Sequence, residues 1–79
     1  MFIEFKATTD NPLFLVSHIF TMLEDSIAGW AKENDIKYTS KFYKRTYRLA
    51  FDDDRHYTVF SLTWQEVPYT EYKIIDRKW

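Results

Sequence analysis

The 79-residue chain contains no cysteine, and this absence excludes several kinds of chemistry. Without cysteine there is no disulfide, no thiol nucleophile and no cysteine-ligated zinc site. A cysteine-free chain fits a reducing compartment, so we expect a cytoplasmic protein. The longest strongly apolar run, residues 13–16, is far too short to cross a bilayer, and we expect no membrane association. The first residues, MFIEF, lack the basic start and apolar core of a secretory signal.

Glycine and proline are also scarce, with one glycine and two prolines in the chain. Little of the chain is therefore given over to flexible loops, and a single glycine excludes a glycine-rich phosphate-binding loop. Neither sign of charge dominates, because 11 cations and 12 acids give a net charge of −1. This balance argues against a strongly basic domain and equally against an acidic mimic of nucleic acid.

Aromatic residues, in contrast, are abundant and make up 20% of the chain. Each buries a large area, which offsets the modest surface burial available to a chain of this size. Disorder goes with few aromatics and high net charge, so a disordered chain is not expected. We predict a single small domain over residues 1–79.

The hydrophobic periodicity predicts an α+β fold with the element order β-α-β-β-β. Residues 2–8 alternate apolar and polar side chains, as in a half-buried strand. Asn11 and Pro12 suit a helix start, and apolar residues at steps of three and four then predict one long helix over 12–32. Gly29 in this helix suggests close approach of its backbone to an aromatic ring. Three further strands are predicted, over 41–51, 56–66 and 70–75. The helix should pack on one face of a mostly antiparallel four-stranded sheet.

The register of a predicted hairpin decides which side chains face the helix. If Asp53 and Asp54 form a two-residue turn, strands 41–51 and 56–66 pair with each other. The face toward the helix then holds Leu49, Phe51, Phe60, Leu62 and Trp64. The outer face holds Lys44, Thr46, Arg48, Ala50, Tyr57, Val59, Ser61 and Thr63. A slip of one residue would bury Arg48 and Lys44 and is disfavoured. Arg45 projects toward the core side, where it either reaches out to solvent or pairs with a helix acid.

No group of residues favours catalysis or metal binding. Asp52, Asp53, Asp54 and His56 could supply ligands to a hard cation, but no glycine marks a sharp turn and no later Glu stands at the calcium-loop spacing. A turn-forming role is the better interpretation, and we predict no metal site and no cofactor. His18 and the scattered serines show no nucleophile motif, so we predict no catalytic residues and no enzymatic activity.

The distribution of charge favours a binding function. Residues 37–48 carry a local charge of +5 and the rest of the chain −6, and surplus exposed aromatics are typical of interfaces. The predicted binding residues are Lys44, Arg48, Tyr57, Val59 and Trp79. We expect a small non-enzymatic protein-binding module that blocks a larger protein by occlusion. The chain is short, free of cysteine, poor in glycine and rich in aromatics and in charges of both signs, which is compatible with the small accessory proteins by which bacteriophages block host proteins. This is an analogy of composition and not a match of motifs. The alternative is RNA or single-stranded nucleic-acid binding through the same basic face. A homodimer through a strand edge is a further expectation.

Overall fold

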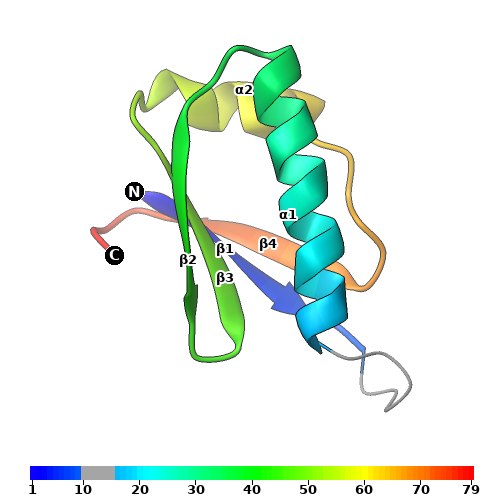
Figure 1. The fold of residues 1–79 in the computed structure, drawn as a ribbon. Helices are drawn as coiled ribbons and strands as arrows, with labels where there is room; N and C mark the ends of the chain where they lie inside the picture. The colour runs from blue at the N-terminus through cyan, green and yellow to red at the C-terminus, as the bar shows by residue number, and fades with distance from the viewer. Residues whose placement is uncertain (10–15) are drawn as a thin grey trace.

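The computed structural model describes residues 1–9 and 16–79 and confirms the predicted α+β class. Its element order is β-α-β-β-α-β (Figure 1). The elements are β1 (Phe2–Ala7), α1 (Val16–Glu33), β2 (Tyr38–Tyr43), β3 (Thr46–Phe51), α2 (Arg55–Thr63) and β4 (Thr70–Ile75). The predicted strands at 2–8 and 70–75 and the long helix are therefore present, whereas the middle of the chain differs from the prediction.

The four strands form one antiparallel sheet in the order β2-β3-β1-β4. This strand order and the element order are those of the split β-α-β, or ferredoxin-like, motif. Strand β1, one of the two inner strands, pairs with β3 on one side and β4 on the other, so that Glu4 lies opposite both Arg48 and Lys73. Strands β2 and β4 are the two edges of the sheet.

Both helices cover the same face of the sheet and form the core with it. Figure 1 shows α1 lying along the sheet and α2 lying across one end. The buried residues of α1 recur at steps of three and four, and they are Ile19, Phe20, Leu23, Ile27, Trp30 and Ala31. The Phe60 ring of α2 joins β1 and β3, because its centroid lies 6.1 Å from that of Phe5 and 6.0 Å from that of Phe51. The predicted burial of Leu49, Phe51 and Phe60 is confirmed.

The segment 56–66, predicted as a strand, instead forms α2 and an extended stretch after it. Tyr57, Phe60 and Trp64 stand three and four residues apart, so a helical turn brings them to one side. The Trp30 indole N–H donates to Thr63 Oγ1 over 2.9 Å and ties α1 to the end of this helix. The strand prediction was wrong because β-branched and aromatic residues have weak helix propensity, and tertiary packing overrides it here. Leu62, predicted to be buried, is 80% exposed on the far side of α2.

The segment 41–51, predicted as one strand, contains the turn between β2 and β3. Lys44 takes a left-handed φ of 55°, and the Thr46 hydroxyl donates to the Tyr43 carbonyl over 2.6 Å. No Gly, Asn or Asp marks this turn, so the sequence pattern gave no signal for it. The predicted hairpin at Asp53 and Asp54 was wrong, since β3 pairs with β2 and β1. Arg45 lies exposed in the turn, away from the core.

Two predictions about α1 have different outcomes. Its end at Glu33 agrees with the predicted end at residue 32 within one position, while the predicted start at Asn11 and Pro12 lies outside the described residues. The predicted close contact at Gly29 was wrong. A Cβ atom added there would meet nothing within 4 Å.

Candidate binding surface

The sheet has one face that neither helix covers, and we call it the outer face. Directly paired residues of neighbouring strands share a face, so the strand registers define its members. They are Phe2, Glu4, Lys6, Thr39, Lys41, Tyr43, Thr46, Arg48, Ala50, Glu71, Lys73 and Ile75. Most of these side chains are charged or aromatic, so this is the face where charges and rings of separate strands meet.

A buried ion pair holds the centre of the outer face. Arg48 was predicted to be exposed, but it is only 7% exposed, and Glu4 beside it is 8% exposed. The Arg48 Nε donates to Glu4 Oε2 over 3.1 Å, and the Arg48 NH2 group lies 3.1 Å from the same oxygen. The guanidinium carbon also lies 4.1 Å from the Tyr43 ring centroid and 4.7 Å from that of Phe2. Arg48 therefore lies on the predicted face, but its guanidinium group is paired with Glu4 and packs against the rings of Phe2 and Tyr43.

The C-terminal residues fold back onto one end of the outer face. The Trp79 and Phe2 rings lie 6.2 Å apart. Lys41 Nζ lies 4.6 Å from the Trp79 ring centroid and donates to the main-chain oxygen of Trp79 over 3.2 Å. The Arg77 guanidinium lies 5.6 Å from the Phe2 ring. Phe2 is fully buried as a result, and Trp79 is half-buried against its own domain.

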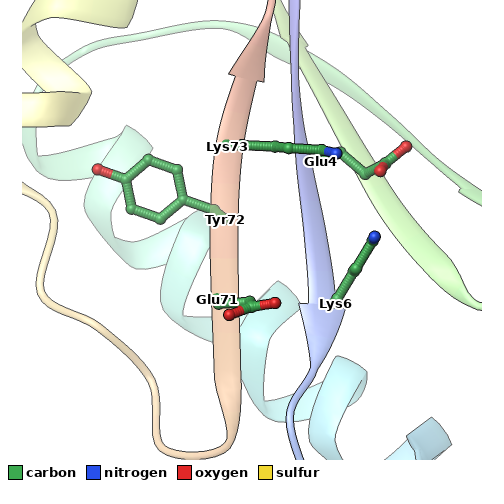
Figure 2. A pocket seen from close by; sticks show the side chains of 5 residues that line it. All are labelled: Glu4, Lys6, Glu71, Tyr72 and Lys73. Carbon is green, nitrogen blue, oxygen red and sulfur yellow. The ribbon is translucent and has the colours of Figure 1, made fainter.

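A shallow hollow of about 270 Å³ opens on the outer face between β1 and β4. Figure 2 shows Glu4, Lys6, Glu71 and Lys73 on one side of these strands, whereas Tyr72 points to the other side. Lys6 lies opposite Glu71 in the register, and Glu4 lies opposite Lys73. This part of the surface therefore carries an alternating pattern of both charge signs.

The two layers of the molecule carry opposite net charge. The segments that contain the strands and the C-terminal residues, 1–9, 38–51 and 67–79, hold eight cations and three acids, a net charge of +5. The described segments 16–37 and 52–66, which contain the helices, hold three cations and eight acids, a net charge of −5. The charge asymmetry seen along the sequence thus becomes an asymmetry between the sheet layer and the helix layer.

The structure separates the five predicted binding residues into two groups. Lys44, Arg48 and Trp79 lie on the outer face or at its rim, and Lys44 Nζ is 5.4 Å from the Tyr43 ring centroid. Tyr57 and Val59 belong to α2 in the other layer. The Tyr57 hydroxyl donates to the Met1 carbonyl over 2.7 Å and accepts the Phe51 N–H over 3.1 Å. Burial raises the pKa of this hydroxyl. The five residues do not share one surface, and their role in binding stays a prediction.

Five exposed side chains that were not among the predicted binding residues lie on the outer face: Lys6, Thr39, Tyr43, Glu71 and Lys73. The alternation in segment 2–8 already placed Lys6 away from the apolar positions. Alternation does not predict which strands become neighbours. It is the pairing of β1 with both β3 and β4 that brings these residues together.

The acidic stretch at 52–54 leads into α2. Asp53 Oδ1 accepts the backbone N–H of Arg55 over 2.9 Å, and its carboxylate pairs with the Arg55 guanidinium at 2.6 Å. These hydrogen bonds lower the pKa of Asp53 to about 2. Across the described part of the chain, no group of three or more His, Cys, Asp or Glu side chains is arranged to hold a metal ion. None of the described helices is both long and apolar enough to span a membrane.

Two hollows lie away from the outer face. One of about 550 Å³ runs between α1 and residues 63–68, and Gly29 and Trp30 form part of its wall. Another of about 340 Å³ lies beside β4, with Leu62, Ile74 and Met1 around it. These three side chains are all exposed, so an apolar patch adjoins this edge of the sheet.

Comparisons with protein-family models, with curated proteins and with solved structures found no match to this chain.

Proposed function

We propose that the protein is a non-enzymatic binding module that recognises an acidic surface of a larger protein and acts by covering it. The observation that carries this proposal is the +5 charge of the sheet layer against the −5 charge of the described helix layer. The uncovered outer face and its rim present Lys6, Lys44 and Lys73 to solvent, together with Tyr43, which is 43% exposed. A basic surface of this kind attracts and orients an acidic partner.

The same face supports a protein partner better than a nucleic acid. Sheets that bind single-stranded RNA stack bases on exposed aromatic rings. Here Phe2, on the central strand, is fully buried beneath Trp79. Glu71 is exposed among the lysines and would repel phosphate groups. Mixed charges arranged in a fixed pattern instead suit the side chains of a folded protein partner.

The proposal is tested by affinity capture from the native host with the tag on the N-terminus, since Trp79 packs against the domain. The wild type is compared with the charge-reversed variant Lys6→Glu/Lys44→Glu. The matched control is Lys32→Glu/Lys37→Glu, which makes the same change in net charge at exposed positions of the segments carrying the −5 charge. Bound proteins are identified by mass spectrometry, and RNA in the eluate is sequenced.

We expect a protein captured by the wild type and by the control, insensitive to nuclease, and lost from the Lys6→Glu/Lys44→Glu variant. Capture that disappears after nuclease treatment, with a steep decrease as salt rises, would favour the nucleic-acid alternative. Equal capture by the wild type and both variants would contradict binding through the outer face.

A further inference from the structure

Strand β4 forms an unpaired edge of the sheet. It pairs with β1 along Thr70–Ile75, and within residues 1–9 and 16–79 no other strand pairs with its second side. An open edge offers backbone donors and acceptors to another strand. The other edge, β2, carries Lys41 as its one charged residue, so two β2 strands have no opposite charges to place against each other, whereas β4 carries both Glu71 and Lys73. The β4 edge is therefore the one to examine for a partner.

The charge pattern of β4 is complementary to itself. In an antiparallel pair, residues directly opposite each other share a face. When two copies pair about Tyr72, Glu71 of each copy lies opposite Lys73 of the other, so two opposite-charge pairs form on the outer face. Moving the register by two residues brings either the two Glu71 or the two Lys73 side chains opposite each other. A register shifted by one residue would bring outer-face residues opposite core-face residues and is excluded.

We propose that two copies of this chain associate through β4, in an antiparallel register centred on Tyr72, to give a continuous eight-stranded sheet. The symmetric pairing uses the same surface of both copies, as a two-fold interface requires. Ile74 lies opposite Thr70 of the second copy in this register, and the exposed patch of Leu62, Ile74 and Met1 adjoins the new strand pair. Lys73 pairs with Glu71 of the second copy in this dimer, but Lys6 and Lys44 on the rest of the outer face stay open, so this inference does not rest on the proposed function.

Charge variants of the full chain test both the dimer and its register. Glu71→Lys brings two lysines opposite each other at both cross-chain pairs, and Lys73→Glu brings two glutamates opposite each other there. Each variant should raise the dimer Kd by about tenfold or more. An equimolar mixture of the two variants restores opposite charges at both pairs and should form a heterodimer. Sedimentation velocity gives the Kd values, and native mass spectrometry separates heterodimer from homodimers.

Both substitutions also disturb neighbours within the chain, because Lys6 lies opposite Glu71 and Glu4 opposite Lys73. The mixture retains these intrachain changes, so its recovery reports contacts between chains. Far-UV circular dichroism and thermal unfolding check that each variant is folded. Lys32→Glu and Glu33→Lys, in the last turn of α1, are the matched controls and should dimerise as the wild type does.

A wild type that stays monomeric at its highest soluble concentration would overturn the proposal. Dimerisation by either Glu71→Lys or Lys73→Glu alone at the wild-type Kd would overturn the register centred on Tyr72. A mixture no more dimeric than its folded components would also contradict it.

Discussion

The buried pair of Arg48 and Glu4 allows the sharpest prediction about stability. Arg48→Met keeps an apolar side chain of similar reach but removes the charge 3.1 Å from Glu4 Oε2. Since Glu4 is only 8% exposed, its carboxylate would lose its partner with little access to water. Breaking a buried ion pair in this way costs about 3–5 kcal/mol. A chain of this size has a total unfolding free energy of about 4–12 kcal/mol, so the loss would be a large fraction of it.

The expected result is a marked decrease in the urea midpoint of Arg48→Met, followed by circular dichroism. The double variant Glu4→Leu/Arg48→Met provides the control, because replacing both partners with apolar groups is often neutral or stabilising. It should recover most of the lost free energy of unfolding. The assigned role of this pair would be refuted if Arg48→Met cost less than about 0.5 kcal/mol, the size of a typical surface substitution. It would also be refuted if the loss of unfolding free energy in the double variant equalled the sum of the losses in Arg48→Met and Glu4→Leu.

Three other predictions concern the helix layer. Gly29→Ala should raise the free energy of unfolding by about 0.5–1 kcal/mol, since the added Cβ meets nothing within 4 Å; a lower urea midpoint would contradict this. Tyr57→Phe should lower it by about 1–3 kcal/mol, because the Met1 carbonyl and the Phe51 N–H lose their shared partner; the wild-type midpoint would count against that role. The pKa of Asp53 is lowered from 3.8 to about 2, so its stabilising contribution is present above pH 4 and is lost as the pH falls toward 2. Over that pH window the thermal midpoint of Asp53→Asn should therefore decrease less than that of the wild type. An equal decrease in the two proteins would contradict the role assigned to Asp53.

Sequence periodicity was sufficient to predict a helix or strand when the same pattern extended over its whole length. Alternation identified β1, and apolar residues at steps of three and four identified α1. It failed for α2, because Tyr57, Val59 and Ser61 alternate with Thr58, Phe60 and Leu62 much as strand residues do. The signal that identifies the helix is the spacing of Tyr57, Phe60 and Trp64, preceded by the aspartates that lead into its start.

The candidate surface shows the same limit. Alternation correctly placed Arg48 on the face away from α1, but its burial depends on Glu4, which is 44 residues away in the chain. The position of Trp79 depends likewise on Phe2 in β1 and Lys41 in β2. Side-chain direction is a local property of a strand, whereas exposure is decided by which strands become neighbours.

The most direct test of the central claim, that the outer face binds a protein partner, is lysine acetylation of the free protein and of its captured complex. Mass spectrometry compares the reactivity of Lys6 and Lys44, at the outer face and its rim, with that of Lys32 and Lys37. All four side chains are exposed in the free chain. Binding through the outer face predicts protection of Lys6 and Lys44 in the complex, with Lys32 and Lys37 unchanged. Protection of Lys32 and Lys37 while Lys6 and Lys44 stay reactive would contradict it.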